Sequence, residues 1–348
     1  MVGSAYPPEI FQFIKDKNLR NSFEKLAIET EEDIQKLVIL LKQFDIEVIR
    51  PTMPKDFEQF QVANGYIAPP ISARDFMCMI DNKLYYPGLP NINHAWMEFS
   101  DKYKIDSKSN LSQNKDWLDF QKQDKYIFDK KLSFYKDIFT LALQQGNEVI
   151  ASPIDYMNSS FITRLGKKMI VGTQNYHDDK KSIKKTFDEM FPHKEIHVAS
   201  SEGHSDGCFA PINEGLVISA YEAIDYKKTF PNAEVVTVPP DVTLKNDKFK
   251  KQILTAEHKW FLEGMEHNND LVGMVDHYFN NWIGNVNETA FMVNILMLDN
   301  KNALCSTDNI QVRKAMKRHG VELHVTPFKH KWFWDCGIHC LTQDLDRE

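Results

Sequence analysis

A single arrangement of hydrophobic and polar positions recurs along the chain: an amphipathic helix, a short turn and a β-rich strand. In the helical segments bulky residues lie three and four positions apart, and each strand is an apolar segment opened by a glutamate. The five strands are DIEVIRP (45–51), GNEVIASP (146–153), HKEIHVAS (193–200), NAEVVTVPP (232–240) and GVELHVTP (320–327). The recurrence predicts five similar units.

Pairs of strand-like runs joined by a turn precede several of these helices. Examples are FMCMIDNKLYYPG (76–88), FITRLGKKMIVGT (161–173) and MVNILMLDNKNALCST (292–307), with Asp-Asn or Gly at the turn. Each unit is therefore ββαβ-like, and the recurrence predicts an α/β fold in which the units of a cyclic array bury their faces on their neighbours. The alternative is an open doubly wound sheet whose strands happen to end alike.

Unequal spacing of the units locates two insertions in a single domain, residues 1–348. The segment 93–126 is polar and poor in aliphatic residues, which predicts surface loop and helix. The segment 241–288 mixes charged with aromatic residues and is a candidate lid over a central site. Its aromatic residues include Trp260, Phe261, Tyr278, Phe279 and Trp282.

The composition is that of a globular protein, with 42% hydrophobic and 26% charged residues among 348. The net charge of −7 disfavours a nucleic-acid partner, because a surface that follows phosphates needs positive charge. No apolar run approaches the roughly 18–20 residues of a membrane span, and the start MVGSAYPPEI lacks the regions of a signal peptide. We therefore expect a cytoplasmic protein without a membrane partner. Its five cysteines, an odd and sparse set, predict reduced thiols.

The chain ends in WFWDCGIHCLTQDLDRE (332–348), where His339 adjoins the second of two cysteines. Zinc needs about four ligands, and Cys336, His339 and Cys340 have no second CxxC or HxxxH to complete a set. A redox CxxC would have two intervening residues, whereas three stand here. Cys340 is thus either a buried structural cysteine or a nucleophile. In an extended segment His339 would point away from Cys340, so we expect the base to come from elsewhere.

The segment SSEGHSDGCFAPINEG (200–215) contains the best candidate base, His204. On a strand His204 and Asp206 would share a face, and the flanking glycines would let a ligand approach. The alternative is a hydrogen-bonded structural histidine. A second acidic candidate is Asp75, which follows Arg74 at a strand entrance and could equally belong to a solvated Arg-Asp pair.

A cysteine, a histidine and two carboxylates suit chemistry on a guanidinium group. Carboxylates accept its forked N–H donors in pairs, and its delocalised charge makes the carbon a poor electrophile that needs a thiolate. His204 could deprotonate the thiol of Cys340 and later protonate a departing amine.

Several motifs resemble those of the amidinotransferase family, in the same order. DCGIHCLTQDLDRE is similar to the family's C-terminal signature of a glycine-rich turn, His-Cys and Thr-x-Asp. GHSDGCF resembles its Met-His-x-Asp segment, and PPISARDFMCMIDNKLYYPG resembles the segment with its first guanidinium-binding aspartate. NETAFMVNILMLD and IQVRKAMKRHGVELHV match the run that leads to the nucleophile. With VGSAYPPE, similar to the end of the family's first strand, the resemblance covers essentially the whole chain.

This resemblance implies the five-bladed α/β propeller, or pentein fold, of the guanidino-group modifying superfamily, which includes glycine and inosamine-phosphate amidinotransferases. It implies ping-pong transfer, in which Cys340 attacks the guanidinium carbon while Asp75 and Asp206 bind its nitrogens and His204 protonates the leaving amine. An acceptor amine deprotonated by His204 then takes the amidino group. The resemblance implies neither cofactor nor metal, and the family suggests a homodimer.

The chain departs from the family pattern at three places. Counting back from Gly166 places Asn158 where the family has the aspartate that orients the histidine, and Asp155 could replace it only with an insertion of three residues. An asparagine has no charge, so it would stabilise an imidazolium less. Ala223 stands where glycine amidinotransferase has an arginine that binds the donor's carboxylate, which leaves the donor open. Because the chain starts at VGS, we expect a truncated first blade.

Three functions follow from these patterns. The first is amidino transfer from arginine or another guanidino compound to an amine. The second is hydrolysis of a guanidino compound by the same covalent route, with water in place of the amine, as in deiminases and dihydrolases. The third is a binding propeller that has lost catalysis through the change at Asn158 and the short N-terminus.

Overall fold

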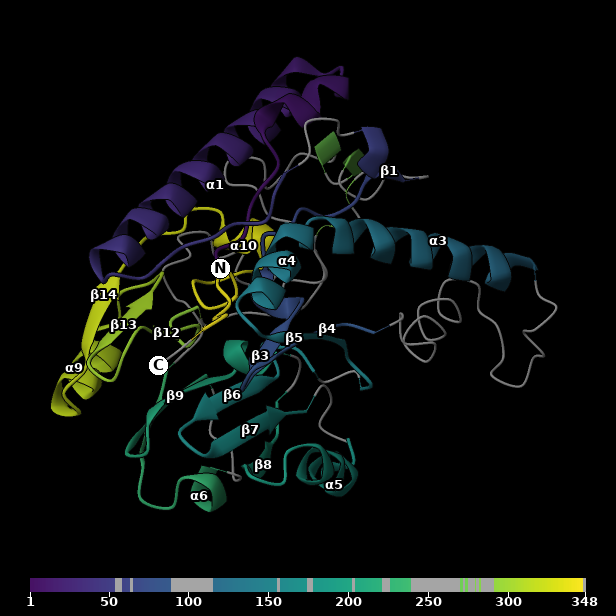
Figure 1. Ribbon diagram of the computed structural model, residues 1–348. Coiled ribbons are helices and arrows are strands. Elements are labelled where there is room, and N and C mark those ends of the chain that lie inside the picture. Colours follow the sequence, from purple (N-terminus) through teal and green to yellow (C-terminus); the bar gives the residue numbers. More distant parts are fainter. Residues whose placement is uncertain are drawn as a thin grey trace.

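Four three-stranded sheets of one topology follow each other along the chain in the computed structural model (Figure 1). In each sheet the first two strands are antiparallel, and the third pairs parallel to the second after a helical crossover. The structure describes residues 1–53, 58–62, 65–88, 115–154, 157–173, 178–201, 204–220, 226–238, 270–271, 273–274, 279, 282 and 291–346.

The strands of the four sheets fall close to the predicted runs, except β9 and β10, for which no run was predicted. They are β3 (Cys78–Ile80), β4 (Lys83–Tyr86) and β5 (Glu148–Ala151); β6 (Ile162–Leu165), β7 (Lys168–Gly172) and β8 (Glu195–Ala199); β9 (Phe209–Asn213), β10 (Leu216–Ser219) and β11 (Glu234–Thr237); β12 (Leu296–Met297), β13 (Asn302–Cys305) and β14 (Glu322–Val325). The alternative of one open doubly wound sheet is wrong, because the described strands form separate sheets.

Helices cross from the second to the third strand of each sheet. They are α3 (Lys115–Ser133) with α4 (Lys136–Gln144), α5 (Lys180–Met190), α6 (Tyr226–Thr229) and α9 (Ile310–Arg318). Two of them begin at residues that satisfy free backbone amides: Asp179 accepts from two amides of α5, and Asn309 does the same for α9. The part of the insertion 93–126 that the structure describes belongs to α3, whereas most of 241–288, the candidate lid, lies outside the described residues.

The first predicted unit differs from the other four. The helix α1 (Lys17–Gln43) follows the short 3-10 helix η1 (Pro8–Phe13), but the predicted strand 45–51 does not form. Its Ile49 carbonyl instead accepts a single bond from Val2 N (2.9 Å), and Val2 forms an isolated antiparallel bridge with Thr342. The strand prediction was therefore wrong, because the N-terminal segment alternates between several partners and no regular ladder develops.

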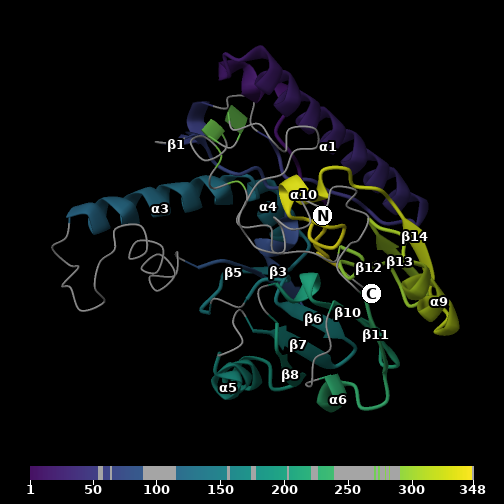
Figure 2. The ribbon, with the colours of Figure 1, turned by 180° about the vertical axis from the view of Figure 1, so that it is seen from behind.

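Apolar side chains join each sheet to the next. Ile80 packs in one cluster with Ile162, and Ile212 packs in another with Leu323. The largest cluster joins α1 to both the fourth and the first sheet, through Leu304 and Leu84. The sheets thus lie around a central region that contains the N-terminus, with α1 along the outside and α3 projecting away (Figures 1 and 2).

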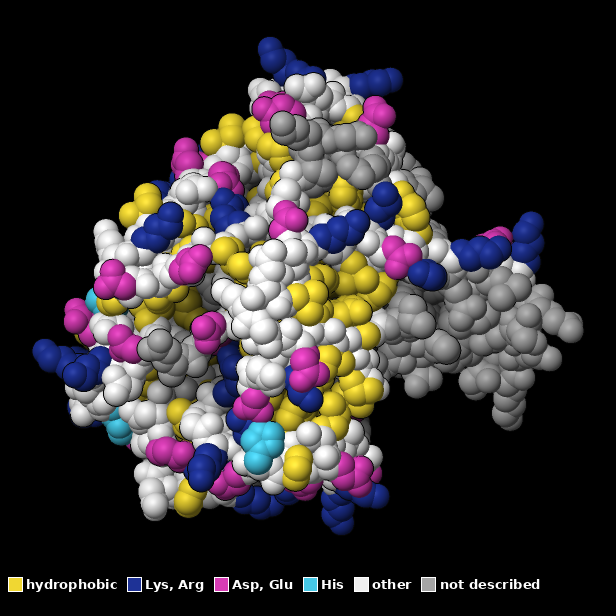
Figure 3. Space-filling view, viewed as in Figure 1, with side chains coloured by type: hydrophobic (Ala, Val, Ile, Leu, Met, Phe, Trp, Pro, Cys, Tyr) yellow, Lys and Arg dark blue, Asp and Glu magenta, His cyan; other side chains and the backbone are white. Residues whose placement is uncertain are grey.

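Acidic and basic side chains are interspersed over the face drawn in Figure 3. Within the described ranges, no helix is both long and apolar enough to cross a membrane.

Candidate active site

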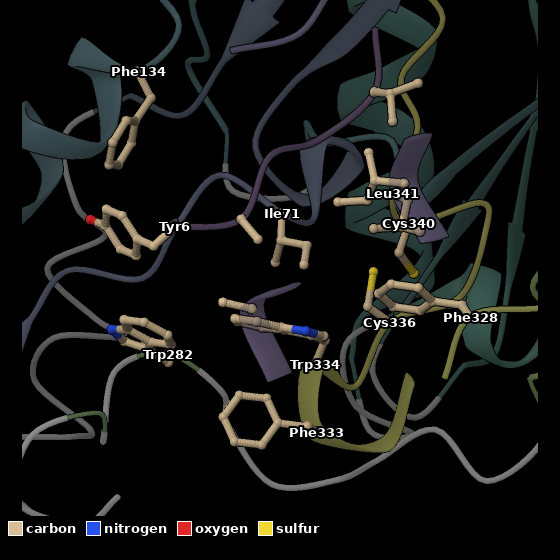
Figure 4. Packing of buried hydrophobic residues seen from close by; sticks show 14 of the residues in the cluster. Tyr6, Ile71, Phe134, Trp282, Phe328, Phe333, Trp334, Cys336, Cys340 and Leu341 are labelled. Atoms are coloured by element: carbon tan, nitrogen blue, oxygen red, sulfur yellow. The ribbon is translucent and has the colours of Figure 1, made fainter. Parts of the chain in front are cut away.

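The tail that contains Cys340 is a turn at the centre of the molecule. The short helix α10 (Lys331–Trp334) ends at Asp335, whose φ of 44° and ψ of 47° place it in the left-handed region. The chain then turns, with Leu341 N bonded to Gly337 O (3.1 Å) and Thr342 N to His339 O (3.1 Å). Cys340 is buried among apolar residues, and Figure 4 shows it beside Cys336 and Phe328.

Asn294 fills the inside of this turn, just before β12. Its Oδ1 accepts hydrogen bonds from the backbone N–H groups of His339 (2.8 Å) and Cys340 (3.2 Å). Only glycine fits at residue 337, because a Cβ there would lie 2.3 Å from Asn294 Oδ1. Sequence reasoning did not single out Asn294, although it lies within MVNILMLD, a segment that carries the family resemblance.

The sulfur of Cys340 contacts two polar side chains. The thiol donates to Asp206 Oδ2 (3.3 Å), and Asn294 Nδ2 donates to the sulfur (3.0 Å). Asp206 Oδ2 also bonds His339 Nδ1 (2.8 Å). His339 and Cys340 therefore share one carboxylate. The expectation that they point to opposite faces was wrong, because the segment is a turn rather than a strand.

His204 and Asp206 do not lie on the predicted strand. Residues Ser205–Gly207 form the 3-10 helix η5, because the N–H groups of Ser205 (2.8 Å) and Asp206 (3.3 Å) both bond Ser160 O. These two bonds fix the backbone that carries Asp206, next to His204. Asp206 is buried, whereas His204 is 40% exposed.

Asp75 lies in the 3-10 helix η3 (Ala73–Asp75), close to His204. His204 Nδ1 is 3.5 Å from Asp75 Oδ1, and the His204 ring meets the edge of Phe161. Arg74, which precedes Asp75, is not a solvated partner of it: the buried guanidinium donates from Nε to His339 O (2.8 Å). The alternative of a solvated Arg-Asp pair is therefore wrong.

Burial and mutual charge shift the pKa values of the four ionisable groups. Burial raises the pKa of Asp75 to about 6, although the charge of His204 opposes this rise and that of Asp206 adds to it. Burial by itself would lower the pKa of His204, but the carboxylates of Asp75, Asp206 and Asp335 together raise it above its ordinary value. Asp335 is thus a further acidic neighbour that the sequence patterns did not indicate.

The pKa values of the other two groups, Asp206 and His339, are lowered instead. Burial opposes ionisation of Asp206, but the hydrogen bond and charge of His339 hold the pKa of that carboxyl below its usual value. Burial and the charge of Arg74 lower the pKa of His339, so its ring is neutral near pH 7 and donates from Nδ1 to Asp206.

Of the two candidates for orienting the histidine, only Asn158 lies within the described residues. Asn158 Oδ1 accepts from Ser160 N (3.1 Å), Ser160 Oγ (2.5 Å) and Phe161 N (3.3 Å), so it closes a local turn. That turn presents the Ser160 carbonyl to η5 and supports His204 only indirectly. Asp155 and Ala223 lie outside the described residues.

Asp344 joins the tail to two sheets. It pairs with Arg74 (3.5 Å) and with Arg164 of β6 (3.1 Å), and Arg164 also donates to Met79 O (2.7 Å). These side chains line a cavity of about 60 Å³ that also reaches Asp206 and His339. Among the described residues, no group of three or more His, Cys, Asp or Glu is arranged to hold a metal ion.

Two buried carboxylate oxygens of this site, Asp75 Oδ1 and Asp206 Oδ1, have no hydrogen-bond partner among the described residues. Leaving a buried acceptor without a donor is costly. The arrangement is therefore suited to a cationic ligand with several N–H donors next to a thiol.

Comparison with known proteins shows which solved structures have a similar fold. No family model and no curated protein sequence matches the chain. SxtG, an amidinotransferase of Microseira wollei in the saxitoxin biosynthetic pathway, has a TM-score of 0.57 at 14% identity and covers 93% of this chain and 84% of its own. The inosamine-phosphate amidinotransferase of Streptomyces griseus also has a TM-score of 0.57 at 14% identity, over 93% and 82%.

A dihydrolase has a similar fold. The product-bound N-terminal domain of ArgZ, an arginine dihydrolase of cyanobacteria, has a TM-score of 0.50 at 10% identity, over 98% of this chain and 95% of that domain. The protein thus has the fold class of enzymes that act on guanidino groups. More particularly, its fold is that of the amidinotransferases, which the sequence motifs predicted.

Proposed function

We propose that the protein is an amidinotransferase that carries an amidino group on Cys340 between a guanidino donor and an amine acceptor. The observation behind this proposal is that two buried carboxylate oxygens, Asp75 Oδ1 and Asp206 Oδ1, have no hydrogen-bond partner among the described residues. A guanidinium supplies both with N–H donors and with positive charge. The other oxygen of Asp206 lies 3.3 Å from Cys340 Sγ, so a guanidinium bound to this carboxylate lies next to the sulfur.

The first half of the reaction forms a bond between Cys340 Sγ and the guanidinium carbon and breaks the carbon–nitrogen bond to the donor. The donor leaves as an ammonium ion with one proton from His204 and one from the thiol. The raised pKa of His204 supports its part as the acid, because it increases the fraction of rings that carry a proton when the donor arrives.

The second half reverses these steps with another amine. The acceptor ammonium gives one proton to His204, and its nitrogen attacks the amidino carbon. The carbon–sulfur bond breaks, and the second proton returns to the sulfur. The partners that we propose are therefore two small molecules, one a guanidino compound and the other an amine.

We further propose that the N-terminal segment with α1 is the first of five units and that the molecule is a five-bladed propeller. The support is the apolar cluster through which α1 packs on both the fourth and the first sheet. The isolated bridge between Val2 and Thr342 would then be what remains of strand pairing in that unit.

Mass spectrometry after incubation with guanidino compounds tests the proposed function. We expect one amidino group on the peptide that contains Cys340, and none on the other cysteines. With arginine as donor, adding a suitable amine should release ornithine without ammonia. Citrulline or ammonia would instead support a hydrolase, and an unmodified Cys340 with every donor would support a binding protein.

A further inference from the structure

We propose that Asn294 is a positioning residue that holds the Cys340 sulfur and stabilises its thiolate. This inference rests on the proposed function for its catalytic meaning. The Asn294 side chain is fully buried, and its Nδ2 lies 3.0 Å from Cys340 Sγ. An N–H group that close to a sulfur stabilises the ionised form more than the neutral one.

The amide of Asn294 is fully occupied. Its oxygen accepts from the N–H groups of His339 and Cys340, and its nitrogen donates to Cys340 Sγ and to Asp206 O (3.2 Å). A primary amide offers two acceptor sites and two donors, so each of them is used. One side chain thus fixes both the backbone and the sulfur of the nucleophile.

The charges around the sulfur explain why a donor is needed there. Asp206 contacts the sulfur with a carboxylate oxygen, which opposes a second negative charge. The other ionisable groups of this neighbourhood are Asp75, His204 and Asp335, with His339 bonded to Asp206 and the Arg74 guanidinium bonded to the His339 carbonyl. Asn294 is a neutral group, so it can donate to the thiolate without adding charge to this balance.

Two variants separate the backbone role from the sulfur role. Asn294→Ala removes all four bonds. Asn294→Asp keeps an oxygen for the two backbone amides but replaces the donor to the sulfur with a second oxygen. The measurement is the rate at which iodoacetamide modifies Cys340 in the folded protein as a function of pH, because the thiolate is the reacting species.

We expect the midpoint of this pH profile to rise by about one unit in Asn294→Ala, with a roughly tenfold lower rate near pH 7. In Asn294→Asp the shift should be at least as large. Unchanged profiles in both variants would overturn the proposal, and so would a failure of both variants to fold, because the role of Asn294 would then be structural alone.

Asn309 offers a matched control. Its Oδ1 accepts from Gln311 N (2.8 Å) and Val312 N (3.1 Å), and its Nδ2 donates to the sulfur of Met292 (3.3 Å). Asn309→Ala should lower the melting temperature and leave the alkylation profile of Cys340 unchanged. An equal shift in this control would mean that loss of stability alone changes the profile, and the proposal would fall.

The assay also keeps this inference distinct from the proposed function. Alkylation requires no guanidino donor. A shifted profile in a protein that never becomes amidinated would keep the role of Asn294 and reject the transferase.

Discussion

Asp75 is the residue at which binding and stability oppose each other. Burial raises its pKa to about 6, so the folded protein binds this proton more tightly than the unfolded chain does. The contribution of Asp75 to stability is therefore greatest at low pH and is lost as the pH rises toward 6. Near neutrality the ionised carboxylate is retained at a cost, which a cationic ligand would offset.

Asp75→Asn is predicted to leave the protein inactive and more stable at pH 7. We expect the free energy of unfolding to increase by on the order of 1 kcal/mol, less than the full pKa shift implies because 32% of the side chain is exposed. Urea unfolding at pH 7 and pH 5 checks this, because the gain should shrink at the lower pH. A less stable variant at pH 7 would mean that the contact with His204 outweighs the cost of burial.

Activity should also depend on the ionisation of Asp75. Since a protonated carboxyl loses its charge and one acceptor, kcat/KM for the donor is expected to fall as the pH drops through about 6. The pH profile of kcat/KM measures this. A profile that stays flat to pH 5 would count against Asp75 as a ligand of the guanidinium.

Cys340 and Cys336 lie close together, and we predict different roles for them. Cys340→Ala should abolish turnover and leave the circular dichroism spectrum unchanged, because the sulfur is the proposed nucleophile. Cys336→Ser should keep activity at some cost in stability, since Cys336 is fully buried. Substantial turnover by the first variant would remove the nucleophile assignment. Complete loss of activity in a folded second variant would give Cys336 a part in the chemistry.

At the scale of elements, local sequence patterns were sufficient to predict most strands of the four sheets. The run 161–173 forms β6 and β7 with Gly166 at a positive φ of 57° in the turn, and GVELHVTP forms β14. Such segments depend on alternation and turn residues, which a sequence displays directly. The predicted strand 45–51 has the same pattern but fails, because Val2, which bonds Ile49 O, also pairs with Thr342 and no regular ladder develops.

The candidate site could be predicted as a set of residues but not as a geometry. His204, Asp206, Asp75 and Cys340 do gather in one region, as their spacing and motifs suggested. The turn at 205–207 and the turn around Cys340 depend on Ser160 O and on Asn294, which are 45 and 46 positions away in the chain. Bonds between residues so far apart in the chain cannot be predicted from a local sequence pattern.

Gly337→Ala tests the turn as an element. The added methyl would lie 2.3 Å from Asn294 Oδ1 and 2.5 Å from its Cγ, so either the turn or Asn294 must move. We expect at least a hundredfold loss of kcat, in line with the sensitivity of catalysis to displacements near 1 Å. Gly215→Ala, whose methyl would meet His319 Nδ1 at 3.3 Å, is the control and should stay within a fewfold of the parent activity. Equal activities would show that the turn is not tightly constrained.

At the scale of the whole molecule, the tail is held by contacts with distant parts of the chain. Met1 and Val2 bond the tail at Gln343 and Thr342, and Asp344 pairs with Arg74 and Arg164. The position of Cys340 thus depends on the N-terminal segment and on the first two sheets together.

Asp344→Asn should therefore weaken both stability and activity. It leaves two arginines without their shared carboxylate, and we expect a loss of about 1–3 kcal/mol in the free energy of unfolding. Asp308→Asn removes an exposed pair with Arg313 and should change this free energy by less than about 0.5 kcal/mol. Chemical unfolding of the two variants provides the comparison. Equal effects would mean that Asp344 contributes no more than an ordinary surface pair.

The shared contacts of the tail bear on attempts to dissect the protein. Arg74, Asp206 and Asn294 bond the segment 339–340 from three separate parts of the chain. A fragment that lacks any one of these parts would lose a contact with Cys340 or with its neighbour, so the site belongs to the assembled sheets and to no single unit.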